Sequence, residues 1–123
     1  VQTCALPICE DDMAFDYFRS ALYLDMEGGV SEEGRLSAWK LHVIAGSSDD
    51  EEANYGGTYR ERDFPENRVP HYDIATTLIP SQTPTGAWRA PFSNIYAFAE
   101  QSFLCELAAS AGRDFSQSSA TSN

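Results

Sequence analysis

The sequence predicts an α+β fold, in which an antiparallel β-hairpin or small sheet accompanies one long buried helix. Residues 21–27 alternate between aliphatic side chains and more polar ones, which is the period of a half-buried strand. Residues 36–44 are rich in β-forming side chains. Residues 93–111 instead repeat apolar side chains every three or four positions, which is the period of a helix. A chain of 123 residues is long enough for one small domain with a modest core.

The first two strands are expected to pair as a hairpin over residues 15–45. Leu22, Leu24 and Met26 alternate with more polar neighbours, so they should face the core. Residues 28–34 are rich in glycine and glutamate and are typical of a turn between antiparallel strands.

The next segment, residues 46–70, is polar, acidic and interrupted by glycine and proline. We expect a long, exposed and mobile connection. Its acidic cluster at residues 49–52 suggests calcium, but it lacks the ligand spacing of an EF-hand loop, and a solvated run of charge is the favoured interpretation. Residues 72–74 and 77–79 then resemble two short strands, followed by an irregular, proline-containing stretch.

The helix over residues 93–111 is predicted to begin with Ser93 or Asn94 as its N-cap and to stop at Gly112. It is apolar nearly all round, so we expect it to be largely buried. Its two carboxylates, Glu100 and Glu106, are either paired with Arg89 or Arg113 or exposed at the edge of the helix, and the sequence leaves both alternatives open.

The formal net charge of −11 argues against binding to nucleic acid, because an acidic surface repels phosphate. No apolar run approaches the length of a membrane span, which takes roughly 20 residues. The odd number of cysteines argues against a disulfide scaffold. Cys4 and Cys9 with His42 and His71 match no zinc-site spacing, which favours unrelated thiols and surface histidines.

Both ends of the sequence differ in character from the middle. Residues 1–8 carry no charge and no periodicity, and codons that encode Cys4 to Ile8 resemble a sequencing adapter. We interpret residues 1–8 as a non-native segment, with an ordinary N-terminal strand as the alternative. Residues 114–123 have few apolar side chains and are expected to form a disordered tail.

The stretch most suggestive of a binding site is residues 84–91, immediately before the helix. Gly86 permits close approach of another group, Arg89 supplies a cation with a planar fork of donors, and the loop leads into a helix N-terminus that suits anions. On these features alone, a structural turn with a surface arginine is the commoner explanation, and an anion or cofactor cradle is the alternative.

Residues 84–113 resemble a segment of the molybdopterin-binding large subunit of the xanthine dehydrogenase/aldehyde oxidase family, closest to the isoquinoline 1-oxidoreductase beta-subunit type. Residues 10–13 with 17–19, residues 34–39 and residues 71–74 resemble further motifs of that family in the same order. The resemblance implies that residues 9–113 are a partial molybdopterin-binding domain, and thus an incomplete piece of a larger subunit.

The same resemblance implies that Gly86, Trp88, Arg89 and Ala90 lie beside a molybdenum–molybdopterin cofactor, including its cytosine dinucleotide form. The resemblance implies an enzyme that hydroxylates an aldehyde or N-heterocycle carbon with water-derived oxygen, and a bacterial location in either the cytoplasm or the periplasm. Its implied partners are the remainder of the large subunit and a small subunit with two-iron, two-sulfur (2Fe–2S) clusters. No residue here matches the family's catalytic glutamate, and Phe92 stands where the family usually has glycine, so a bulky side chain would crowd the cofactor.

The alternative function is a small acidic protein-binding module without a cofactor. A piece of a larger subunit should be inactive, expose apolar surface and be unstable or aggregate alone. A complete module should instead be a monomer that unfolds cooperatively.

Overall fold

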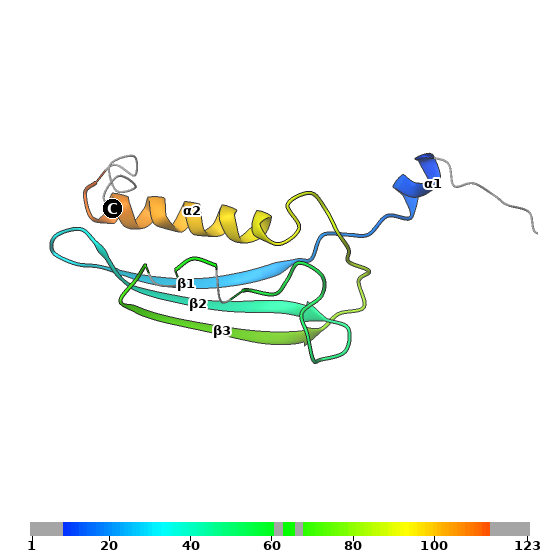
Figure 1. Ribbon diagram of the computed structural model, residues 1–123, viewed down its shortest axis with the longest axis horizontal. Helices are drawn as coiled ribbons and strands as arrows, with labels where there is room; N and C mark the ends of the chain where they lie inside the picture. Colours follow the sequence, from blue (N-terminus) through cyan, green and yellow to red (C-terminus); the bar gives the residue numbers. More distant parts are fainter. Residues whose placement is uncertain (1–8, 61–62, 66–67, 114–123) are drawn as a thin grey trace, which may run out of the picture.

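The computed structural model describes residues 9–60, 63–65 and 68–113 of the chain. It confirms the predicted α+β class, because a three-stranded sheet carries one long helix along one face (Figure 1). A short helix at the N-terminus, which the sequence analysis did not predict, lies beyond the end of the sheet. In chain order the elements are α1 (Cys9–Ala14), β1 (Leu22–Val30), β2 (Leu36–Ser47), β3 (His71–Pro80) and α2 (Ser93–Ser110).

The predicted hairpin is confirmed, since β1 pairs with β2 in antiparallel register. The loop expected over residues 28–34 was wrong in part, because Gly28 to Val30 belong to β1 and the turn covers residues 31–35. Leu24 lies opposite Val43 and Met26 lies opposite Leu41. Because side chains alternate between the two faces of a strand, this register puts the apolar set of both strands on one face, the core face. The opposite face, here called the open face, carries the intervening residues.

The two short strands expected at 72–74 and 77–79 form one continuous strand, β3, which pairs in parallel with β2. The strand order is therefore β1-β2-β3, with β2 in the centre. Parallel neighbours cannot be joined by a tight turn, so the chain needs a long crossover between them. Residues 48–70 provide that crossover.

The expectation of an exposed connection over residues 46–70 was wrong in part. Residues 48–52 are exposed, but Gly56, Gly57, Pro65 and Val69 are buried. The physical reason is the parallel pairing of β2 with β3, because the crossover has to return along the sheet and covers part of its core face.

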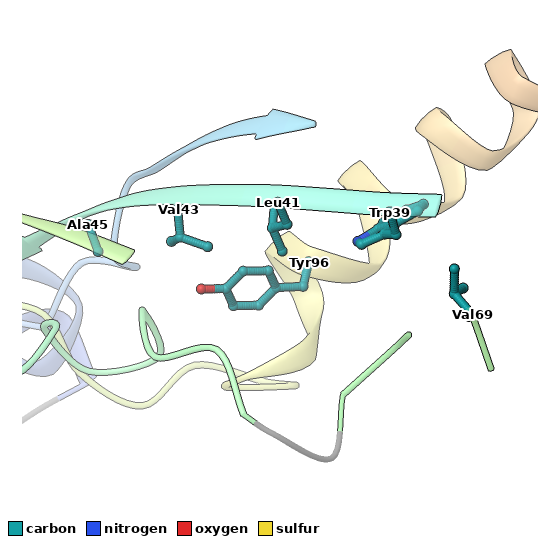
Figure 2. Packing of buried hydrophobic residues seen from close by; sticks show 6 residues of the cluster. All are labelled: Trp39, Leu41, Val43, Ala45, Val69 and Tyr96. Carbon is teal, nitrogen blue, oxygen red and sulfur yellow. The ribbon is translucent and has the colours of Figure 1, made fainter. Parts of the chain in front are cut away.

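The core is centred on β2. Its inward side chains meet Val69 from the crossover and Tyr96 from α2 (Figure 2). Trp39 packs edge-on against Phe64, with ring centroids 5.0 Å apart, and against Phe103 of α2, at 5.4 Å. The side chains that β2 contributes are those of Trp39, Leu41, Val43 and Ala45.

The prediction that α2 is largely buried was wrong. Tyr96 is its one buried residue, and the ring of Phe98 is 77% exposed. A helix on one side of a sheet can bury only the face that meets the strands. Gly28 of β1 marks that contact, since a Cβ there would lie 2.6 Å from Cδ1 of Leu107.

The ends of α2 differ in how well they were predicted. The N-cap is Phe92 rather than Ser93 or Asn94, and it makes no side-chain capping bond. The stop at Gly112 is confirmed, because this residue has φ +67° and the N–H groups of Gly112 and Arg113 donate to the carbonyls of Ala109 and Ala108. Neither described helix has the length and apolar character required to cross a bilayer.

Candidate functional site

Two segments far apart in the sequence meet beside the start of α2. They are residues 15–19, here called the N-terminal strap, and residues 84–91, here called the Trp88 loop. The N–H of Phe18 donates to the carbonyl of Pro84 at 2.9 Å, and the N–H of Gly86 donates to the carbonyl of Phe18 at 3.2 Å. The segments thus form a short parallel β-bridge.

Side chains strengthen this contact. The indole N–H of Trp88 donates to the carbonyl of Tyr17 at 2.6 Å, and the guanidinium of Arg19 donates to the carbonyl of Arg89 at 3.1 Å. The same guanidinium lies 5.9 Å from the centroid of the Trp88 ring, within cation–π range. Three interactions of different kinds therefore fix the loop on the strap.

The close approach that Gly86 permits is made by Tyr17. A Cβ on Gly86 would lie 2.7 Å from both Cβ and Cγ of Tyr17, closer than such atoms can come. The glycine is therefore required by contact between the two segments, whatever else binds to the loop.

Ala90 adopts φ +54°, in the left-handed region. A non-glycine residue there costs about 1–2 kcal/mol. This strained residue directly follows Arg89 and precedes the turn into α2, where the N–H of Asn94 donates to its carbonyl at 3.4 Å. Strain of this kind tends to gather at binding sites.

Phe92, expected to crowd a cofactor, packs against the crossover. Its ring centroid lies 5.4 Å from that of Tyr55, and the guanidinium of Arg60 lies 3.7 Å from its centroid. The bulky side chain therefore has a structural role between the Trp88 loop and the crossover.

The four residues predicted to lie beside a cofactor differ in what they still offer a ligand. The N–H of Gly86 and the indole N–H of Trp88 are already used. Within the described ranges, the guanidinium of Arg89 makes no hydrogen bond or ion pair, and Arg89, Ala90 and Trp88 are all exposed. The loop can present one cation and one aromatic ring to an anionic ligand, so it fits a molybdopterin phosphate in part.

Glu100 takes neither of the arginine partners considered for it. It is half-buried and accepts a hydrogen bond from the hydroxyl of Tyr59 at 3.2 Å. Burial raises the pKa of Glu100 to about 7; the hydrogen bond from Tyr59 opposes this rise, and the charge of Asp63 adds to it. Burial is also the main cause of the raised pKa of the Tyr59 hydroxyl.

Glu106 and Arg113, the other charged residues considered near the end of α2, do not pair with each other. Glu106 is exposed, which agrees with the second alternative for it, and Arg113 donates to the carbonyl of Glu33. Tyr59 was not predicted to take part, because a tyrosine in an acidic connection carries no signal that it will contact a helix.

Neither metal site considered from the sequence is assembled among residues 9–60, 63–65 and 68–113, where no three His, Cys, Asp or Glu side chains gather. Cys4 lies outside the described residues. The imidazole Nε2 of His42 lies 2.8 Å from the hydroxyl of Thr77. In the acidic cluster, the carboxylate of Asp49 accepts hydrogen bonds from the N–H groups of Glu51 and Glu52 at 3.0 and 3.1 Å, which closes a turn.

No family model, curated protein or solved structure matches the chain.

Proposed function

We propose that the chain is part of the large, molybdopterin-binding subunit of a molybdenum hydroxylase of the xanthine dehydrogenase/aldehyde oxidase type. The Trp88 loop would form one wall of the cofactor site. The observation that carries the proposal is the contact between the N-terminal strap and this loop, since residues 17–19 and 84–91 resemble motifs of the same family and lie together.

The contacts give each loop residue a role in the proposed site. The bond from Trp88 to Tyr17 fixes the orientation of the indole, whose exposed ring can line the site. Arg19 holds the carbonyl of Arg89, and the exposed guanidinium of Arg89 can donate to an anionic phosphate. Gly86 has no side chain, which lets Tyr17 pack directly against the backbone of the loop.

When bound, the cofactor would supply the oxidation that hydroxylates an aldehyde or N-heterocycle carbon with oxygen from water, and pass electrons to the iron–sulfur clusters of a partner subunit. This chain would position the cofactor and contribute no catalytic residue. We expect the chain alone to be inactive.

Exposed apolar surface supports membership of a larger assembly. Met13 is 83% exposed and Phe15 is 85% exposed, and the ring of Phe98 protrudes from the outer face of α2. Large apolar side chains that are exposed to this extent can be covered by contact with further polypeptide.

The proposal is tested by expressing the complete gene around this coding sequence, with its neighbouring iron–sulfur gene, in a host that makes the cofactor. We expect molybdenum and a fluorescent pterin to copurify with the protein. Arg89→Ala should lower molybdenum occupancy about tenfold at limiting cofactor, because a hydrogen bond to a charged group is lost. Arg68→Ala, which removes an exposed arginine of the crossover, is the matched control. Absence of molybdenum and pterin from the wild-type protein would refute the proposal.

One observation favours the alternative, a small acidic binding module. Trp39 is 2% exposed, and its core joins residues of β2, the crossover and α2. The purified chain separates the two functions. A monomer with a sharp two-state thermal transition supports the module, whereas aggregation or a broad transition supports the subunit.

A further inference from the structure

The outer edge of β3 has few of the features that normally protect a sheet edge, because its proline, Pro80, stands only at the last position and its one charged residue, Asp73, lies near the start. Its inner edge pairs with β2, but none of the described strands pairs with the outer one. Eight of its ten residues are exposed, and residues 74–80 carry no charge. The opposite edge strand, β1, is interrupted by a register shift between Gly29 and Val30 and carries two carboxylates. An exposed, regular and uncharged edge is a template for pairing with another strand.

A hollow of about 430 Å³ lies beside the start of β3. It lies over the small residues Gly29 and Ala38 of β1 and β2. Glu27, Lys40 and Asp73 also line it. A long side chain from a strand paired with β3 would have room to enter this hollow.

The electrostatics of the hollow favour a cation. Three carboxylates of the open face, those of Asp25, Glu27 and Asp73, lie near a single lysine, Lys40. The hydrogen bond from Lys40 to Glu27 and the charges of Glu27, Asp25 and Asp73 raise the pKa of Lys40. Three negative charges therefore surround one positive charge at the site, in a chain whose net charge is −11.

We propose that the outer edge of β3 and the adjoining hollow bind an extended, basic segment of a partner polypeptide. The main chain of the segment adds a strand to the sheet, which is a common mode of peptide recognition. A lysine or arginine of the segment meets Asp73 at the rim of the hollow, where the surplus negative charge of Asp25 and Glu27 also favours a cation. A second copy of this chain is the weaker candidate, because two molecules of charge −11 repel each other.

The test uses the full chain fused to a soluble carrier, with fluorescence anisotropy as the readout. The probe is a labelled seven-residue peptide of alternating valine and arginine. We expect saturable binding that weakens with added salt. Asp73→Asn should weaken binding about threefold, since one exposed ion pair adds only modestly to affinity. Glu51→Gln, which removes the same charge from the distant exposed turn, should leave binding unchanged.

Two further peptides separate strand pairing from general attraction of charge. A peptide N-methylated at alternate residues keeps its charge but cannot pair through that edge, so we expect it not to bind. A peptide with glutamate in place of arginine should also fail. The proposal is overturned if either peptide binds as well as the probe, or if Glu51→Gln weakens binding as much as Asp73→Asn. Sedimentation showing that the chain forms a dimer, and that the probe peptide dissociates this dimer, would identify a second copy as the occupant of β3 and would overturn it too.

Discussion

The hydroxyl of Tyr59 lies 3.2 Å from Oε1 of Glu100, and this hydrogen bond ties the crossover to the middle of α2. The neighbouring ring of Tyr96 packs edge-on against Tyr59 at 4.9 Å and donates its own hydroxyl to the carbonyl of Gly57 at 2.8 Å. The crossover is thus held to α2 by two tyrosines and one half-buried carboxyl group, whose protonation affects the stability of the contact.

Stability should fall as pH rises from about 4.5 to about 7. The pKa of Glu100 is about 7 in the folded chain and 4.5 in the reference state, so between these values the folded state binds the extra proton. Its contribution is fully present below pH 4.5 and is lost as pH rises through about 7. We expect the melting temperature to be lower at pH 8 than at pH 5.5, as measured by circular dichroism.

Glu100→Gln should flatten this dependence, because glutamine can still accept the bond from Tyr59 but does not titrate. Glu106→Gln, at an exposed position of the same helix, should leave the dependence in place. Equal pH profiles for wild type and Glu100→Gln would contradict the assignment.

Replacement of Trp39 should show how much of the stability lies in the core. Trp39 is 2% exposed and packs between Phe64 and Phe103. Trp39→Ala should cost about 3–5 kcal/mol, a large part of the stability of a small domain. Trp39→Phe should cost less, because it also removes a buried indole N–H that has no partner among the described residues. Urea denaturation measures both variants, and Tyr23→Ala, at an exposed position, should change stability by less than about 1 kcal/mol.

Gly86→Ala should separate the Trp88 loop from the N-terminal strap. The new Cβ would meet the side chain of Tyr17 at 2.7 Å, and overpacking of this kind costs about 1–3 kcal/mol. In a Trp39→Phe background Trp88 is the remaining tryptophan, so its fluorescence should shift to longer wavelength and become easier to quench. Tyr17→Gly in the same chain should relieve the clash, and an unchanged spectrum in Gly86→Ala alone would show that the contact is not rigid.

Ala90→Gly should stabilise the chain. Glycine adopts φ +54° without the strain that a Cβ causes. Its greater conformational entropy in the unfolded state offsets part of this effect, so the free energy of unfolding should rise by about 0.5–1 kcal/mol. Ala87→Gly is the matched control, since Ala87 lies in the same loop without a positive φ, and it should destabilise slightly. Thermal melts of the two variants should therefore shift in opposite directions, and shifts of the same sign would argue against strain at Ala90.

The candidate site was predicted only at the level of its segment. The pattern of Gly86 and Arg89 before a helix indicated where a binding loop would lie. It held no information about Tyr17, whose main chain and side chain secure the loop. The contact joins segments about 70 residues apart through backbone hydrogen bonds, side-chain hydrogen bonds and a cation–π interaction, and no local pattern of residues indicates which distant segment will lie beside the loop.

The sequence by itself determined the elements that are marked by a local pattern of apolar, polar or turn-forming residues. The alternation through Leu22, Leu24 and Met26 predicted a strand and its buried face, and Gly112 predicted the end of α2. Tertiary structure alone decided that β3 runs parallel to β2, that the crossover is partly buried and that α2 keeps an exposed face. The physical reason is that periodicity shows which residues prefer to leave water, whereas burial depends on which layer of the fold comes to cover them.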